Sequence, residues 1–210
     1  MMIRTTLFAL FLASAAAAQE TPPPTPAIPA PVAEAPRPVG PRVTLQTGAG
    51  KITIELDKAA APITSANFLS YVDQKRFDGT SFYRAMKIPA DTPFGLIQAG
   101  VRGRSDKVLP PIAHEPTSKT GLSHIDGAVS MARGAVGSAQ GDFFIIVGNL
   151  SSLDASAKDP GYAVFGHVVE GMDVVLKIIN SPTSPTAGEG AMKGQMIAAP
   201  LPIMAAKRAK

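Results

Sequence analysis

Short strand-like segments separated by loops recur along most of this chain, and they restrict its fold severely. They lie at residues 43–47, 51–56, 80–86, 96–100, 127–132, 143–148 and 162–169, with a last one within 194–203. Apolar and polar residues alternate in VTLQT and KITIEL, and this period of two predicts β-strands, because successive side chains of a strand point to opposite faces. No repeating strand–helix–strand unit separates these segments, so their order favours an antiparallel sheet or barrel over a parallel sheet.

Two segments break this rhythm with helical spacing of apolar residues. They are APITSANFLSYVDQ at residues 61–74, with Pro62 suited to a first helical turn, and GMDVVLKIIN at residues 171–180. Each predicts an amphipathic helix with one face turned to a core. We expect both helices to cap the ends of the sheet, whose closure would remove exposed strand edges.

The first 41 residues have a different character. Arg4, the apolar run at residues 7–13 and three alanines ending at Ala18 predict a secretory signal peptide over residues 1–18. Residues 19–41 are rich in proline and predict a semi-rigid linker in extended conformation. The domain would then span residues 42–203, and residues 204–210 would form a basic disordered tail. In a bacterium with an outer membrane, this places the mature protein in the periplasm.

Composition limits the kinds of partner that fit this chain. The chain contains no cysteine, which excludes disulfides, thiol nucleophiles and Cys-ligated metals. Its net charge is +4, but residues 43–206 hold 14 Lys and Arg against 14 Asp and Glu, a net of zero. A basic groove for nucleic acid is therefore unsupported. No segment is long and apolar enough for stable membrane insertion once the signal is removed.

The stretch from residue 80 to residue 100 holds the first candidate binding residues. On a regular strand Phe82, Arg84 and Met86 share one face, and Leu96 and Gln98 share a face of the next strand. An Arg and a Gln on an apolar wall would suit a mostly apolar ligand that carries a carbonyl oxygen. Alternatively, Arg84 lies on the solvated outer face of a sheet with its stem over its neighbours.

Histidines next to acidic residues raise the question of a metal. The pairs His114–Glu115 and His124–Asp126 lie in or near the irregular segment 101–125, but neither has a recognised zinc spacing. Surface or hydrogen-bonding roles are the simpler interpretation, and we expect no metal site.

Six short segments occur in a fixed order: SFYRAM, LIQAG, GAVSMA, SAQGDFFI, SSLD and YAVFG. Together they resemble the cyclophilin-type peptidyl-prolyl cis-trans isomerases, from about Val43 to the end of the second helix and on to Ile203. The resemblance implies a mainly β fold, an eight-stranded antiparallel closed barrel capped by two α-helices. It also implies that Xaa–Pro segments of unfolded or flexible proteins bind on the outer face of the barrel, with no cofactor.

The resemblance also implies roles for individual residues. Arg84 matches the family's catalytic arginine, and Gln98 the glutamine that holds this arginine and the substrate. The remaining positions match substrate-binding residues, namely Phe82, Leu96, Met131, Ala132, Asp142, Phe144, Leu153 and Tyr162. Asp142 and Tyr162 depart from the usual glutamine and histidine, so Asp142 could pair with Arg84 or place a charge in the substrate groove.

Three functions fit these residues. The first is an active, monomeric isomerase that assists the folding of exported proteins, favoured by Arg84, Gln98 and Phe144. The second is a non-catalytic module that binds proline peptides or acts as a chaperone, for which Asp142 is the main evidence. The third is a structural barrel tethered by its Pro-rich arm.

Overall fold

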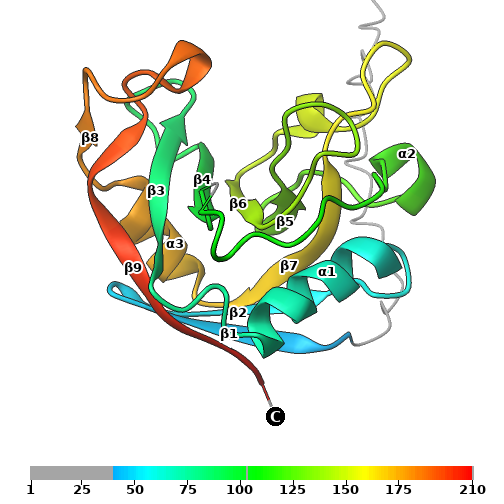
Figure 1. The fold of residues 1–210 in the computed structure, drawn as a ribbon. Helices are drawn as coiled ribbons and strands as arrows, with labels where there is room; N and C mark the ends of the chain where they lie inside the picture. The colour runs from blue at the N-terminus through cyan, green and yellow to red at the C-terminus, as the bar shows by residue number, and fades with distance from the viewer. Residues whose placement is uncertain (1–39, 103, 210) are drawn as a thin grey trace, which may run out of the picture. The chain divides into compact units, whose positions relative to one another are not determined.

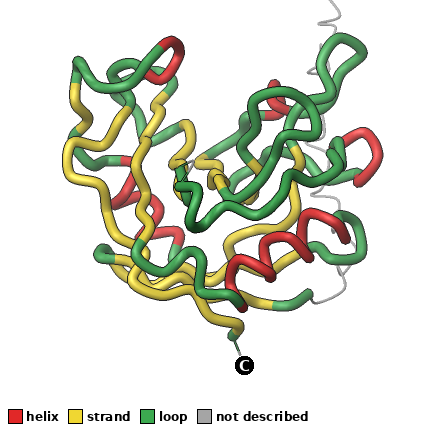
Figure 2. Tube along the Cα trace, viewed as in Figure 1, coloured by secondary structure: helices red, strands yellow, loops and turns green. Residues whose placement is uncertain are grey.

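The computed structural model describes residues 40–102 and 104–209. The predicted signal peptide and all but the last two residues of the predicted linker lie outside this range, so both stay predictions. Within it, the residues form an antiparallel barrel with loops gathered at one end (Figures 1 and 2).

Eight strands close the barrel, in the spatial order β1-β2-β7-β5-β6-β4-β3-β9, and β9 pairs back onto β1. Their bounds are β1 Arg42–Thr47, β2 Gly50–Leu56, β3 Thr80–Lys87, β4 Gly95–Gly100, β5 Ala128–Met131, β6 Asp142–Val147, β7 Ala163–Glu170 and β9 Met196–Arg208. A two-residue strand, β8 (Thr183–Ser184), pairs with the start of β9. The predicted mainly β, eight-stranded antiparallel barrel is confirmed.

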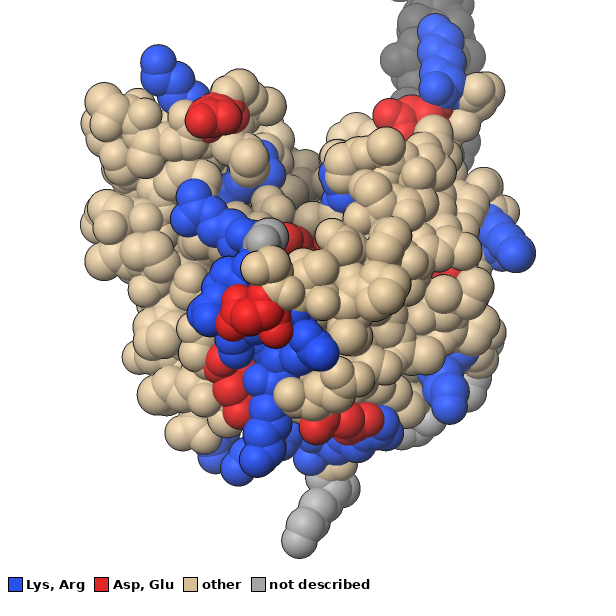
Figure 3. Space-filling model, in the orientation of Figure 1, with Lys and Arg blue, Asp and Glu red and all other residues tan. Residues whose placement is uncertain are grey.

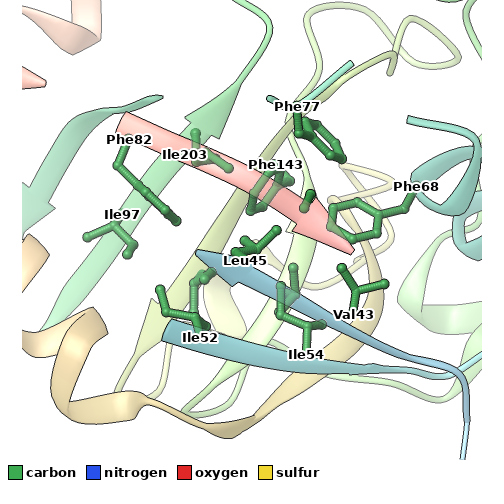
Figure 4. Close-up of a cluster of buried hydrophobic side chains, with 14 of the residues drawn as sticks. Val43, Leu45, Ile52, Ile54, Phe68, Phe77, Phe82, Ile97, Phe143 and Ile203 are labelled. Atoms are coloured by element: carbon green, nitrogen blue, oxygen red, sulfur yellow. The ribbon is translucent and has the colours of Figure 1, made fainter. Parts of the chain in front are cut away.

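Inward-facing residues of the strands fill the barrel with apolar side chains (Figure 4). Leu45, Ile54 and Phe143 are completely buried. The Phe68 ring from the first helix meets the Phe143 ring edge to face, with centroids 5.3 Å apart. Because alternate residues of each strand point inward, the alternation in VTLQT and KITIEL maps directly onto this core.

Helix α1 (Pro62–Asp73) lies against β7 and β9, with Phe68, Tyr71 and Val72 turned into the core. Its own N-cap residue, Ala61, has no side chain that could bind the first amide groups. The buried carboxylate of Glu115 does so instead, accepting hydrogen bonds from the backbone of residues 63 and 64 at 3.1 and 2.8 Å. Glu115 is therefore a helix cap and not a metal ligand.

Helix α3 (Met172–Ile179) packs on the opposite side of the barrel and contacts β2, β3, β4 and β6. Its buried face consists of Val174, Val175, Ile178 and Ile179. Both predicted helices are thus present. A third, four-residue helix, α2 (Thr117–Thr120), lies within residues 101–125, which were expected to be irregular.

The prediction of a disordered tail at residues 204–210 is wrong for all of it that the structure describes. Strand β9 continues to Arg208, and Leu45 pairs with Ala206, which is 3% exposed. Arg208 also donates two hydrogen bonds to Asp73 of α1. The lysine and arginine content suggested a tail, but Ala206 turns inward and supplies the inner face of the closing strand, while Lys207 and Arg208 stay exposed.

Acidic and basic side chains are interleaved on the surface, as the lower front of the space-filling view shows (Figure 3). Exposed ion pairs such as Arg104–Asp106 and Arg208–Asp73 account for part of this mixture. None of the helices described is long and apolar enough to cross a membrane.

Candidate active site

A β-bulge in β3 sets the orientation of the candidate catalytic arginine. Phe82 pairs with Ala99 and Arg84 pairs with Gln98, so Tyr83 is an extra residue opposite the regular ladder of β4. Phe82 points into the core, where it is 0% exposed, whereas Tyr83 and Arg84 both line a pocket outside the barrel. The prediction that Phe82 binds substrate is therefore wrong, because the bulge reverses the side-chain alternation between residues 82 and 84.

Beyond the bulge, strand pairing aligns the outward-facing residues in a row. Arg84 pairs with Gln98, Gln98 with Phe144, and Phe144 with Ser130. Met131 follows Ser130 and so points inward, where it is 2% exposed in the core. Met131 therefore does not line the pocket, contrary to expectation, because strand alternation gives the outer face to Ser130 and Ala132.

Arg84 is half-buried and held on two sides by amide oxygens. Its Nη1 donates to Gln98 Oε1 at 2.9 Å, and its Nε and Nη2 donate to Gln195 Oε1 at 2.9 and 2.7 Å. A longer contact joins Nη2 to the sulfur of Met86 at 3.6 Å. Burial lowers the pKa of Arg84, but a guanidinium stays charged in proteins. All these partners are neutral, so the positive charge is available to a ligand.

The pocket beside Arg84 has a volume of about 820 Å³. It opens where the molecule is hollowed between the β3 side and the loops that follow β5 and β6 (Figure 3). Its lining combines residues of β3, β4, β6 and the start of β9 with residues from neighbouring loops. They are Tyr83, Arg84, Met86, Leu96, Gln98, Arg102, Ala132, Arg133, Gly134, Ser138, Gln140, Asp142, Phe144, Leu153, Tyr162, Gly188, Glu189, Met192 and Met196.

The apolar part of this pocket belongs to a second cluster of packed side chains outside the barrel. Phe144 is its centre, with the Tyr162 ring edge-on to it at 5.4 Å. Leu96, Ala132 and Leu153 pack in the same cluster. These five residues were expected in the substrate site, and the structure brings all five to the pocket. They form an apolar surface on which a proline ring could be held.

Asp142 lies on the pocket face of β6 but does not pair with Arg84. Its Oδ1 accepts hydrogen bonds from the Tyr83 hydroxyl at 3.3 Å and from the Arg102 backbone amide at 2.8 Å. Gly100 makes this approach feasible, since a Cβ there would lie 2.5 Å from the same oxygen. Burial raises the pKa of Asp142, partly offset by these hydrogen bonds. Of the two suggested roles for Asp142, pairing with Arg84 is excluded.

Behind Phe144 lies a buried Ser–His–Asp arrangement. His124 Nδ1 lies 2.6 Å from Asp154 Oδ1, and His124 Nε2 lies 3.0 Å from the Ser130 hydroxyl. Burial lowers the pKa of His124 despite the nearby carboxylate, which favours the neutral ring. Both Ser130 and His124 are 0% exposed, so no substrate can reach the serine. The ring of His124 stacks on Phe144 at 5.8 Å, and the arrangement supports the pocket wall.

Among the described residues, no group of three or more His, Cys, Asp and Glu side chains could hold a metal ion. His124 is bound within the protein, and His114 contacts the backbone carbonyl of Pro160 at 3.0 Å. The interpretation of these histidines as hydrogen-bonding residues agrees with these contacts.

Sequence reasoning missed Tyr83 and Gln195. Tyr83 neighbours Arg84, but regular alternation assigns it to the opposite face, and no local signal reveals the bulge. Gln195 precedes β9 and lies 111 positions from Arg84 in the chain. No spacing rule connects the two residues, because their contact depends on the loop before β9 returning over β3.

The fold and the site define a class of protein: a closed antiparallel barrel with an arginine beside an apolar pocket on its outer face. The model of one family, the cyclophilin-type peptidyl-prolyl cis-trans isomerases, matches residues 42–198. The match covers well over half of the chain. The chain therefore belongs to the cyclophilin-type peptidyl-prolyl cis-trans isomerase family, a family of enzymes.

Two relatives from bacteria agree with this assignment. A peptidyl-prolyl cis-trans isomerase of Acinetobacter baylyi is 41% identical over 146 residues, which cover 68% of this chain and 73% of the relative. Peptidyl-prolyl cis-trans isomerase A of Dickeya dadantii is 39% identical over 140 residues, covering 65% of this chain and 70% of the relative.

Solved structures support the fold. A cyclophilin-type isomerase of Cryptosporidium parvum superposes with a TM-score of 0.65 at 20% identity, over 81% of this chain and 98% of that protein. A second structure of that protein, in the presence of the dipeptide Ala-Pro, gives the same TM-score over 80% and 99%.

Proposed function

We propose that this isomerase acts on Xaa–Pro bonds of exported proteins as they fold, with Arg84 as its catalytic group. The observation that carries the proposal is the environment of Arg84. Its guanidinium is fixed by two neutral amide oxygens and lies beside an apolar pocket centred on Phe144.

The reaction explains why such a site suffices. Rotation about a peptide bond meets a barrier of about 18–20 kcal/mol, because amide resonance is lost midway. No bond to carbon is made or broken. As the bond twists, the proline nitrogen regains its lone pair and becomes a hydrogen-bond acceptor. A donor fixed at that position stabilises the twisted state more than either planar state, which is the requirement for catalysis.

Different pocket residues hold the proline ring and donate to the twisted bond. Leu96, Ala132, Phe144 and Leu153 hold the proline ring still while the chain on the other side of the bond rotates. Arg84 has five N–H groups, and its contacts with Gln98, Gln195 and Met86 occupy Nε, both N–H groups of Nη2 and one N–H of Nη1. The second N–H of Nη1 is left for the substrate.

The alternative of a non-catalytic peptide-binding module drew its main support from Asp142. Neutralisation of Arg84 by that carboxylate would weaken catalysis while leaving the apolar pocket intact. Asp142 instead contacts Tyr83 and the backbone of Arg102. This contact pattern favours the active enzyme.

An isomerisation assay on a proline peptide tests the catalytic proposal. We expect acceleration by the wild-type protein and a fall in kcat/KM of about 10²–10³-fold in Arg84→Ala. Arg84→Lys keeps the charge but loses the planar pair of donors, so its activity should fall between the two. Equal acceleration by wild type and Arg84→Ala would refute the role of Arg84. Peptide binding without any acceleration would support the non-catalytic module.

The exported location rests on the predicted signal peptide at residues 1–18 and the linker at residues 19–41. We propose that the chain is cleaved after Ala18 and acts as a monomer in the periplasm. Fractionation of the source cells, with sequencing of the mature N-terminus, tests the location. Full-length protein in the cytoplasmic fraction would contradict it, and gel filtration of the mature protein checks its size.

A further inference from the structure

Four side chains join the catalytic arginine to Asp142 in one continuous chain of hydrogen bonds. Gln98 Oε1 accepts from Arg84 Nη1 at 2.9 Å, and Gln98 Nε2 donates to the Tyr83 hydroxyl at 2.8 Å. The Tyr83 hydroxyl in turn donates to Asp142 Oδ1 at 3.3 Å. Gln98 and Tyr83 are 9% and 5% exposed, so water has little access to the middle of this chain.

When Asp142 is ionised, the hydrogen bonds of this series can run in only one direction, with each group donating to the next from Arg84 towards Gln98 and from Gln98 through Tyr83 to Asp142. A guanidinium has only donors, so Gln98 must turn its carbonyl to Arg84 and its amide nitrogen to Tyr83. The tyrosine oxygen then accepts, and its proton must go to another acceptor. An ionised carboxylate has only acceptors and fills that place. The two charged ends therefore impose the same orientation on Gln98.

The surroundings of Asp142 fix the acceptor end. The Arg102 backbone amide donates to the same oxygen at 2.8 Å, and the Arg102 guanidinium lies over the Tyr83 ring, 5.2 Å from its centroid. Asp142 pairs with Gly100 in the last residue pair of the ladder between β4 and β6. Tyr83 can reach this oxygen because it is the extra residue of the bulge in β3.

We propose that Asp142 and Tyr83 are positioning residues for the isomerase reaction. The Asp142 carboxylate is the terminal acceptor of a one-way chain that keeps the Gln98 carbonyl on Arg84 and so aims the guanidinium at the substrate. This inference rests on the proposed catalytic role of Arg84. It gives the aspartate a role in the reaction that an amide at residue 142 fills less well, because a carboxylate is the stronger acceptor for the Tyr83 hydroxyl and carries no donor that competes with this orientation.

The other role suggested for Asp142 is to place a negative charge on the substrate groove. The two roles predict different kinetics. A positioning chain acts on the guanidinium, so its loss lowers kcat for every substrate, with little change in KM. A groove charge acts on binding, so its removal changes KM in opposite directions for peptides with a basic and an acidic residue before the proline.

The test compares the near-isosteric variants Tyr83→Phe and Asp142→Asn and their combination with wild type. Each single variant should lose between about 10-fold and 100-fold in kcat, with KM within about twofold of wild type. The double variant should be no slower than the slower single variant, because both substitutions break the same chain. Asp106→Asn is the matched carboxylate-to-amide control, since Asp106 is an exposed partner of Arg104. It should keep wild-type kinetics.

A pH profile provides a second readout. The titratable and charged groups around Asp142 are Tyr83 from β3, Arg102 after β4 and Tyr71 from α1. Protonated Asp142 has lost its charge and can donate to Tyr83, so the acceptor end no longer supports the orientation of Gln98 that Arg84 requires. Wild-type kcat should therefore fall on the acid side, with a midpoint above the usual aspartate range because burial raises the pKa of Asp142. Asp142→Asn should lack this limb.

The outcomes separate this inference from the proposed function. If wild type depends on Arg84 but Tyr83→Phe or Asp142→Asn keeps full kcat, the positioning chain is refuted and the catalytic proposal stands. KM changes that follow the charge of the peptide would also overturn it, in favour of the groove charge. If Arg84→Ala is as active as wild type, the proposed function itself fails.

Discussion

Phe143 and Phe144 are neighbours in β6, yet they belong to two different layers of the molecule. Phe143 packs inside the barrel against the rings of Phe68, Phe77 and Phe82. Phe144 lies outside the barrel wall, stacked on His124 and edge-on to Tyr162. One face of the strand therefore contributes to the stability of the fold, and the other face builds the pocket.

The two layers differ in their content of hydrogen-bonded polar side chains. The inner layer is apolar side chains in contact with one another. The outer layer contains both apolar and polar residues. Its polar residues form two hydrogen-bonded series, each of which ends at a carboxylate. Asp142 ends the series that includes Arg84, and Asp154 ends the series that includes His124. The comparison indicates that a pocket needs fixed donors and acceptors where a core needs only shape and volume.

The largest expected effect is the loss of stability in Phe143→Ala, compared with a smaller loss in Phe144→Ala. Phe143→Ala removes a completely buried ring and should lower the free energy of unfolding by about 3–5 kcal/mol. Phe144→Ala opens a wall that already faces the pocket, and should cost about 1.5–3 kcal/mol. It should also lower kcat/KM by at least about 10-fold through lost contact with the proline ring. Urea unfolding and the isomerisation assay measure both quantities.

If Phe143→Ala lost activity without losing stability, or the two substitutions had the same effect on both quantities, the division into a structural and a functional face would be wrong. A conservative check is Phe144→Leu. It keeps an apolar wall and should recover most of the stability that Phe144→Ala loses.

The second prediction concerns the closing strand. Removal of residues 204–210 deletes the part of β9 that pairs with residues 43–46 of β1, and exposes the inner layer where Ala206 covers it. We expect the midpoint of thermal unfolding to fall by roughly 5–10 °C, which corresponds to a loss of about 2–3 kcal/mol. Removal of Lys210 alone is the control and should have no measurable effect. An unchanged midpoint after the longer truncation would restore the disordered-tail interpretation.

The smallest effect concerns His124, which behaves as a core residue within the outer layer. Its pKa in the folded protein is below the usual histidine value, because burial disfavours the charged ring. The unfolded chain therefore binds the proton more readily, and stability decreases as the pH falls below about 6.5. The slope contributed by this one group is at most about 1.4 kcal/mol per pH unit. Unfolding in urea at several pH values between about 7.5 and 5 measures this slope.

His124→Gln is the matched variant for this slope, since its amide can donate to Asp154 and accept from Ser130 without titrating. The variant should show a flatter dependence of stability on pH over the same range. An identical slope in wild type and variant would assign the pH dependence to other groups.

Much of the fold could be predicted from the sequence because the signals are local. The hairpin of β1 and β2 follows from alternation, the strands around Phe144 and Phe165 follow from short apolar runs between loops, and both long helices follow from a spacing of 3.6 residues. The cap of α1 by Glu115 could not be predicted, since its carboxylate reaches the helix from 51 positions away. The end of β9 was also missed, because its basic composition concealed the one inward-facing residue, Ala206.

Most of the candidate site could also be predicted from the sequence. Eight of the ten residues expected there do line the pocket, namely Arg84, Gln98, Leu96, Ala132, Asp142, Phe144, Leu153 and Tyr162. Phe82 and Met131 do not, since both point into the core. For Met131 the alternation of GAVSMA already contained the answer. For Phe82 it did not, because the bulge at Tyr83 is a property of the paired strands and not of either strand alone.

The sequence by itself determined which segments become strands and helices, because periodicity states which side chains share a face. It also determined that an arginine and a glutamine would stand near an apolar wall, through the ordered motifs from SFYRAM to YAVFG. Only the tertiary structure decided what Arg84 contacts and where Asp142 points. The bulge shifts the register by one residue, and barrel closure brings Gln195 and Asp142 beside a strand that is distant in the chain. Side-chain contacts of this kind depend on register and closure, which no local pattern records.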